Sequence, residues 1–226
     1  IHLWAMSAYK TYSARWWLGT IAGGLCLVTL ASGAVTVLAG SLILMIRRII
    51  IKDKDGTAIT AILLLLAMAG IGIALTPTIA AHDVLKAQSV SQFLLALATV
   101  ISWPVSNIVI GLLIVQMPLF FGVLTILRNS DYHRPEFIFI IAIAAWLFGQ
   151  FSSIAYGRAA GVLSSRYLDL FAIGLVLNFS VSMFLQMQIG KKYRLAFVSA
   201  IVIWLAIIGW ASVQSASNLS VQLRNK

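Results

Sequence analysis

Long apolar runs separated by short polar segments dominate the pattern of this chain. About 20 consecutive apolar residues are enough to cross a bilayer core of roughly 30 Å. The runs predict about six membrane-spanning helices, over residues 17–46, 57–81, 105–127, 137–155, 170–189 and 195–213. We therefore expect an all-α fold, a polytopic transmembrane helical bundle over residues 17–213.

The two ends of the chain differ from these runs. Residues 1–16 interleave Trp and Tyr side chains with Lys10 and Arg15, a mixture typical of the lipid headgroup layer. This pattern predicts an interfacial amphipathic helix that leads into the first span. Residues 214–226 are expected to form a polar tail. Because the chain begins with Ile rather than Met, we expect its numbering to start inside a longer gene product or after a processed segment.

Two prolines interrupt the third apolar region. Residues 93–104 end at Trp103-Pro104 and are too few to cross a bilayer alone, so they predict an interfacial or re-entrant segment. Pro118 is expected to kink the following span, over residues 105–127. Such breaks free backbone carbonyls that must face protein or water, and they often line cavities for that reason.

Small residues run along the first apolar stretch, at Gly19, Gly23, Gly24, Gly33 and Gly40. Glycine has no side chain to hold neighbouring helices apart, and close packing drives helix association in lipid. We therefore expect this stretch to pack closely against other helices.

The composition narrows the class of protein. The chain is 61% hydrophobic and 10% charged, whereas a soluble domain has roughly 25% charged residues. Its net charge of +10 lies in short loops, as orientation signals and contacts with anionic lipids require. The loops at 47–56, 128–136 and 190–194 hold nine of the 16 Lys and Arg residues and are predicted to be cytoplasmic. Membrane lipids, and not nucleic acid, are the expected partners.

The residues that bind metals are few. Cys26 is the only cysteine, and the three histidines lie far apart in the chain, at positions 2, 82 and 133. No spacing typical of metal ligands is present. We expect neither a metal site nor a cofactor.

The segment "SIAYGRAAGVLSSRYLDL" (153–170) gathers charge between two apolar runs. If it is helical, Arg158, Arg166 and Asp169 share one polar face. A guanidinium group makes bidentate contacts with phosphate oxygens, so we predict phosphate or lipid binding by Arg158 and Arg166 with the hydroxyl-bearing Ser164, Ser165 and Tyr167.

The carboxylates nearby are candidates for catalysis. Asp169 is suited to orient an arginine or to act as a base toward a hydroxyl. His82 beside Asp83 is a second candidate acid–base pair, although adjacent helical residues point about 100° apart. An alternative remains open, in which Arg158 and Arg166 extend toward the headgroups and Arg166 with Asp169 forms an ordinary i,i+3 helix pair.

A resemblance rests on residues 93–180, carried by Tyr156-Gly157-Arg158 and Ser164-Ser165-Arg166-Tyr167. These residues resemble the C-terminal half of bacterial polytopic membrane proteins from surface-polysaccharide loci, which are loosely similar to multi-span (GT-C-like) lipid-linked-sugar glycosyltransferases. The resemblance implies an enzyme or transporter for polyprenyl-phosphate-linked sugars, multi-pass in the bacterial cytoplasmic (inner) membrane and acting at its extracytoplasmic face. Such enzymes carry a catalytic carboxylate in an early extracytoplasmic loop, and nothing in this sequence matches it.

Two other functions are compatible with the same sequence. A noncatalytic integral subunit would pack against other membrane subunits through the glycine-rich first span. A lipid or sugar transporter would use the proline-broken helices, although no charged residue lies within a predicted span, where ion-coupled transporters usually carry one.

Overall fold

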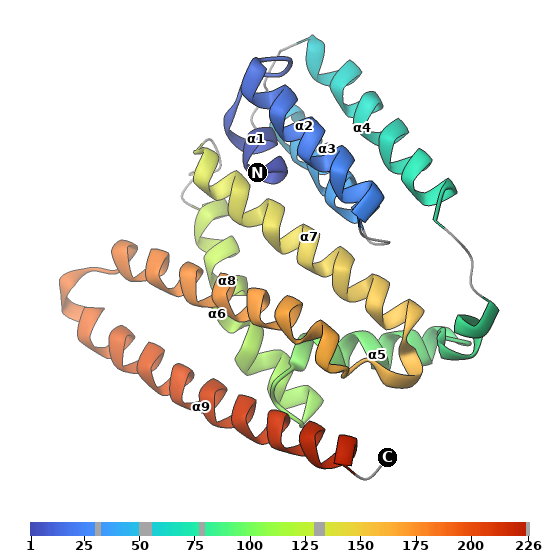
Figure 1. Cartoon of the computed structure of the whole chain (residues 1–226). Helices are drawn as coiled ribbons and strands as arrows, with labels where there is room; N and C mark the ends of the chain where they lie inside the picture. Colours follow the sequence, from blue (N-terminus) through green and yellow to red (C-terminus); the bar gives the residue numbers. More distant parts are fainter. Residues whose placement is uncertain (30–32, 50–55, 77–79, 129–133, 225–226) are drawn as a thin grey trace. The chain divides into compact units, whose positions relative to one another are not determined.

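The computed structural model describes residues 1–29, 33–49, 56–76, 80–128 and 134–224, and every regular element in these ranges is helical (Figure 1). Five of these helices are long and apolar enough to cross a membrane. They correspond to the predicted second to sixth spans, so the expected all-α transmembrane bundle is confirmed, and the protein is a multi-pass membrane protein. The five are α4 (Thr57–Ala74), α6 (Ile108–Arg128), α7 (Pro135–Gly157), α8 (Leu168–Gln188) and α9 (Lys191–Arg224).

Shorter elements complete two compact units. The shorter helices are α1 (His2–Ala8), α2 (Ala14–Thr29), α3 (Gly33–Ile49) and α5 (Val90–Ser102), with the 3-10 segments η1 (Ala80–Leu85), η3 (Ala159–Gly161) and η4 (Ser165–Tyr167). Unit 1 comprises Ile1–Ala80 and Ile126–Gln150, and unit 2 comprises Ala81–Thr125 and Phe151–Lys226.

In unit 1, the predicted first span is divided into two antiparallel helices, α2 and α3. Gly33 lies against the carbonyl group of Cys26, and the ring of His2 lies between Gly23 and Gly40. These pairings require the chain to reverse direction between the two helices. The glycines permit the close approach, because a Cβ atom at Gly33 or Gly40 would collide with these groups. The long uncharged run therefore forms a helical hairpin instead of the single span predicted over residues 17–46.

The short helix α1 packs on this hairpin. His2, Ala5, Met6 and Ser7 are buried, and Nδ1 of His2 lies 2.9 Å from the carbonyl oxygen of Gly19. Arg47, in the last turn of α3, donates from Nη1 to the carbonyl oxygens of Met6 and Tyr9, each at 2.9 Å. Part of the predicted interfacial segment thus has a protein-covered face, while its position at the membrane surface stays a prediction.

The rest of unit 1 packs around large buried side chains. Trp16, Ile43 and Leu65 are fully buried, and they bring α2, α3 and α4 into one hydrophobic cluster. The hydroxyl of Tyr12 donates to Thr60 at 2.8 Å. The first part of α7 joins the same unit, where Nε1 of Trp146 donates to the hydroxyl of Thr36 at 2.9 Å.

In unit 2, side chains replace the backbone hydrogen bonds that Pro118 removes from α6. Proline has no N–H to donate to the carbonyl four residues earlier, which is that of Ile114. Nε1 of Trp204 donates to this carbonyl at 2.9 Å. The next N–H, that of Leu119, donates to Oδ1 of Asn178 at 3.0 Å. α6 is thereby fixed to both α8 and α9.

The helix before α6 is too short to cross a bilayer. α5 has 13 residues, about 20 Å at a rise of 1.5 Å per residue, and its interfacial or re-entrant position stays a prediction. Ser89 caps its start by accepting from the backbone N–H of Gln92. At its end, the carbonyl of Ile101 accepts from Nε2 of Gln116 at 2.9 Å.

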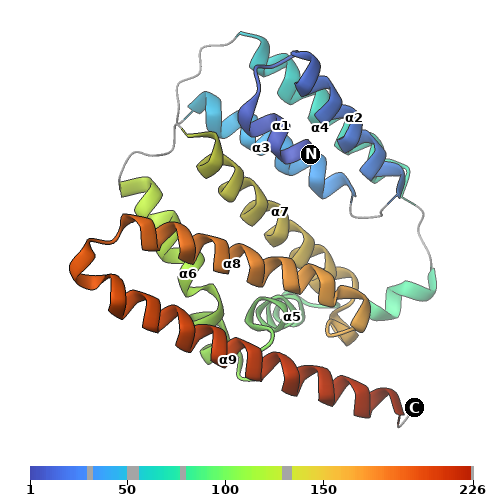
Figure 2. The ribbon, with the colours of Figure 1, turned by 60° about the vertical axis from the view of Figure 1, so that its left-hand side comes forward.

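α8 and α9 lie side by side and run in opposite directions, as both views show (Figure 2). α9 has 34 residues, about 51 Å by the same rise, which exceeds the hydrocarbon thickness of roughly 30 Å. The predicted polar tail is therefore helical through Arg224 and continues the sixth span without a break.

Candidate functional site

The segment between α7 and α8 is not one continuous helix. α7 ends at Gly157, the backbone of Arg158 leaves the helical region (φ −142°, ψ 32°), and only the turns η3 and η4 precede α8. Glycine and serine weaken helices in this stretch, glycine through backbone entropy and serine through competing hydrogen bonds. The single helical face predicted for the charged residues is therefore not formed.

The same segment nevertheless forms a small pocket. Arg158, Ser164, Arg166 and Tyr167 line a cavity of about 170 Å³ together with Leu85 and Gly161. Four of the five residues predicted to bind phosphate or lipid thus lie around one space. The side chain of the fifth, Ser165, lies outside the described part of the chain.

His82 lies beside Arg158. Its Nε2 is 3.5 Å from Nη2 of Arg158, a long contact in which the guanidinium is the donor and the imidazole the acceptor. The connection that carries His82 is fixed to the end of α7 by a hydrogen bond from the N–H of Ala87 to the carbonyl of Tyr156, at 2.8 Å. His82 therefore contributes to the surroundings of the arginine pocket.

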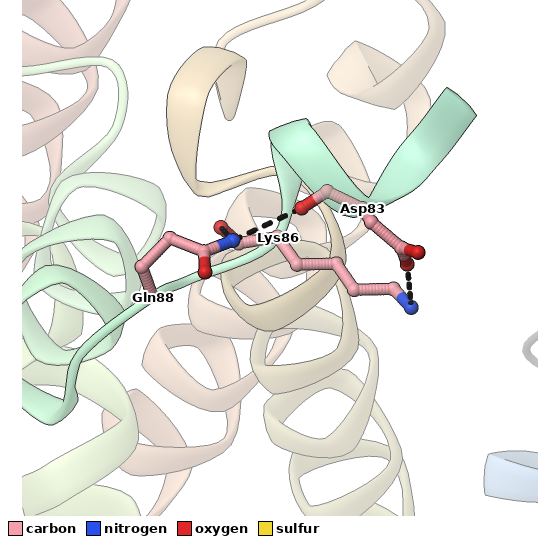
Figure 3. A network of polar contacts seen from close by, with 3 residues as sticks. All are labelled: Asp83, Lys86 and Gln88. Carbon is pink, nitrogen blue, oxygen red and sulfur yellow. Dashed lines mark hydrogen bonds and ion pairs between the residues drawn. The ribbon is translucent and has the colours of Figure 1, made fainter. Parts of the chain in front are cut away.

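Asp83 has a different partner from His82. Its carboxylate accepts from Nζ of Lys86 at 2.6 Å, and Nε2 of Gln88 donates to the backbone carbonyls of Asp83 and Lys86 (Figure 3). The hydrogen bond and the negative charge of Asp83 raise the pKa of Lys86. The Asp83 side chain is 64% exposed, so this carboxylate stabilises a surface turn, and the structure does not join it to His82 as an acid–base pair.

Asp169 lies in the first turn of α8, where the helix dipole favours a carboxylate. It is exposed and is not one of the residues that line the arginine pocket. In the described part of the chain, no ion pair joins it to Arg166, whose guanidinium carbon lies instead 5.9 Å from the centre of the Tyr167 ring. A catalytic role for Asp169 stays a prediction.

A larger cavity of about 650 Å³ adjoins the arginine pocket, and Gly161 lines both spaces. Its wall includes the proline break, in agreement with the expectation that such a break lines a cavity. Nε1 of Trp103 donates to the hydroxyl of Ser215 at 2.9 Å, which ties the end of α5 to α9. The lining residues are Thr99, Ser102, Trp103, Pro104, Val105, Ser106, Ala159, Ala160, Gly161, Val162, Leu163, Ile207, Trp210, Ala211, Gln214, Ser215 and Asn218.

The contribution of α9 to this cavity is not predicted by the sequence pattern. Trp210, Gln214 and Asn218 recur every four residues, a spacing that places them on one face of a helix. The polarity of the segment after residue 213 predicts a tail instead. The helical period of its polar residues is the signal that identifies them as a cavity wall.

Neither a protein-family model, nor a curated protein, nor a solved structure matches this chain. Within the described ranges, no group of three or more His, Cys, Asp or Glu side chains is placed to hold a metal ion. The described side chains around the two cavities offer guanidinium, hydroxyl, amide and indole groups to a ligand.

Proposed function

We propose that this protein binds a phosphate-bearing lipid in the pocket formed by Arg158 and Arg166, as part of a glycosyltransferase or polysaccharide-assembly enzyme acting on polyprenyl-phosphate-linked sugars. The observation that carries the proposal is that two guanidinium groups, a serine hydroxyl and a tyrosine line one pocket in a chain with few charges. Charge-assisted hydrogen bonds from arginine to phosphate are stronger than neutral ones and geometrically specific.

The surroundings of the pocket support an anionic ligand. Arg158 is half-buried, and its neighbour His82 accepts from it without supplying a negative charge. Asp83 is engaged by Lys86, and Asp169 does not line the pocket. No carboxylate among the described residues therefore neutralises the two arginines within the pocket, and a phosphate would fill that role.

The hairpin of α2 and α3 supports an extracytoplasmic position for the pocket. If residues 14–49 enter and leave the membrane on one side, Lys10 and Arg15 join the basic loops predicted to be cytoplasmic. These then hold eleven of the 16 Lys and Arg residues, in place of nine. By alternation of the spans, the segment that carries Arg158 and Arg166 would then lie on the opposite side, as the positive-inside rule favours.

A noncatalytic subunit is the second candidate, favoured by the positions of the carboxylates. A general base must lie within hydrogen-bonding distance of the proton it removes. Asp83 is paired with Lys86 and Asp169 is exposed outside the pocket. A subunit that presents a lipid-linked sugar to a catalytic partner requires the arginine pocket but no base of its own.

Binding measurements on the purified chain in detergent test the proposal. Native mass spectrometry with a polyprenyl phosphate and with phosphatidylglycerol separates a specific lipid phosphate from a general headgroup contact. We expect Arg158→Gln and Arg166→Gln each to weaken polyprenyl phosphate binding about tenfold, the loss of about 1.4 kcal/mol. Lys192→Gln is the matched control, because it removes a positive charge at the start of α9 from a residue that does not line the pocket. Equal losses in all three variants, or equal binding of the two lipids, would contradict the proposal.

Transfer of a sugar separates the two candidates. Incubation of the protein with a polyprenyl-phosphate-linked sugar and an acceptor glycan yields product if the chain is itself the enzyme. A noncatalytic subunit would bind the lipid but yield no product. Sugar transfer would then appear only when other membrane proteins are co-expressed with it.

A further inference from the structure

We infer that the 650 Å³ cavity beside the arginine pocket binds the neutral sugar of the lipid-linked ligand. This inference rests on the proposed function, since it assigns the part of that ligand that lies next to the phosphate. The cavity volume falls within the range of about 300–1,000 Å³ typical of small-molecule sites. The cavity neighbours the arginine pocket, since Gly161 lines both.

The lining of the cavity suits a neutral, hydroxyl-rich ligand. Gln214, Ser215 and Asn218 supply amide and hydroxyl groups that both donate and accept hydrogen bonds. Among the described residues that line it, none is a Lys, Arg, Asp or Glu. These residues offer no countercharge to a phosphate, and an isoprenoid chain would leave their amides without partners, which is unfavourable for polar groups that a ligand covers.

Two indole groups add an apolar surface to this polar wall. Trp103 and Trp210 both line the cavity, one from the end of α5 and the other from α9. The negative face of an indole ring attracts the C–H groups on the face of a sugar ring. The hydrogen bond from Trp103 to Ser215 fixes the position of the first of these two indole groups.

Gly161 lines both spaces and has open space in its Cβ direction. A Cβ atom built on it meets nothing within 4 Å, and its backbone conformation accepts other residues. It lies in the turn η3, three residues after Arg158, whose carbonyl accepts from its N–H at 2.8 Å. A phosphate held by the arginines would thus have its sugar directed past Gly161 into the larger cavity.

Two lipids that differ only in the sugar test the inference. Dissociation constants are measured by native mass spectrometry for a polyprenyl phosphate and for the same lipid carrying one neutral hexose on the phosphate. We expect the wild-type chain to bind the hexose-bearing lipid about tenfold more tightly. Trp210→Ala and Gln214→Ala should remove this preference while leaving the affinity for the bare lipid unchanged. Val213→Ala, on the same helix but outside the cavity lining and 68% exposed, is the control.

A substitution at Gly161 tests the connection itself. Gly161→Phe places a ring at the residue that lines both spaces and should abolish the preference for the hexose. Gly190→Phe, at another glycine with open space around its Cβ direction, should keep it.

The outcomes for the two sites are distinguishable. Equal affinity for both lipids in the wild-type chain overturns the sugar site and leaves the arginine site standing. Binding of the hexose-bearing lipid that needs Trp210 but not Arg158 supports the sugar site and contradicts the proposed phosphate site. Binding of neither lipid overturns both.

Discussion

The indole Nε1 of Trp204 lies 2.9 Å from the carbonyl oxygen of Ile114. This carbonyl belongs to the turn of α6 whose usual donor is absent because residue 118 is proline. In a bilayer, an unsatisfied backbone group costs several kcal/mol, so a side chain that supplies the donor makes the proline tolerable.

Trp204→Phe should therefore destabilise the protein, because it removes the donor and keeps an aromatic ring. We expect the free energy of unfolding to fall by about 1–3 kcal/mol. Thermal unfolding in detergent measures this loss. In a Pro118→Ala background, the alanine supplies its own N–H to the Ile114 carbonyl, and the loss should be smaller. A double-mutant cycle measures this difference. An equal loss in the two backgrounds would show that Trp204 acts through packing alone.

Gly40 is a position where any side chain should destabilise unit 1. A Cβ atom there would collide with the ring of His2, and overpacking of this kind costs typically about 1–3 kcal/mol. Gly40→Leu should lower the unfolding midpoint, whereas Gly70→Leu, where the Cβ direction is open, should not. The prediction fails if the two variants unfold at the same temperature.

The stability of α1 should depend on pH through His2. Burial lowers the pKa of His2 from its ordinary value of 6.5, against the opposing effect of its contact with the Gly19 carbonyl. The unfolded chain then binds a proton more readily than the folded chain, so the stabilising contribution is present above pH 6.5 and decreases as the pH falls below it.

Hydrogen exchange measures this effect directly. We expect amides of α1 to exchange faster at about pH 5 than at about pH 7.5, after correction for the intrinsic rate. His2→Gln should remove the pH dependence of exchange. His82→Gln, which removes a histidine in unit 2, is the control and should retain it. Unchanged pH dependence in His2→Gln would assign the effect to another group.

The hairpin of α2 and α3 makes a prediction about membrane sidedness. In a Cys26→Ser background, cysteines replacing Lys10 and Lys192 should be protected from an impermeant maleimide in intact cells, because both are predicted to lie on the cytoplasmic side. A cysteine replacing Val84, which is 78% exposed in the connection after α4, should be labelled. Labelling of position 10 together with position 84 would contradict the hairpin and support the single first span that the sequence predicts.

The sequence is sufficient to predict the helical class and most spans, because apolar length alone determines them. It is not sufficient for residues 17–46, where length is compatible with one tilted helix or with a hairpin. The choice depends on contacts between positions far apart in the chain, such as His2 with Gly23 and Gly40. Periodicity within one helix carries no information about such contacts.

The candidate site is predicted in part. The arginines and their hydroxyl neighbours stand out in the sequence because charge is rare in this chain. Their arrangement around a pocket depends on the breaks at η3 and η4, which a helical projection of 153–170 does not reproduce. The sequence does not predict that α9 lines the larger cavity, because a polar helical face beyond a span has the same composition as a polar tail.

The bonds around Pro118 also bear on how the chain is made. Synthesis proceeds from the N-terminus, so α6 enters the bilayer before Asn178 and Trp204 have been translated. Until then, the Ile114 carbonyl and the Leu119 N–H lack the partners that the finished protein gives them. The hydrogen bonding of α6 around its proline is therefore complete only after both α8 and α9 have been synthesised.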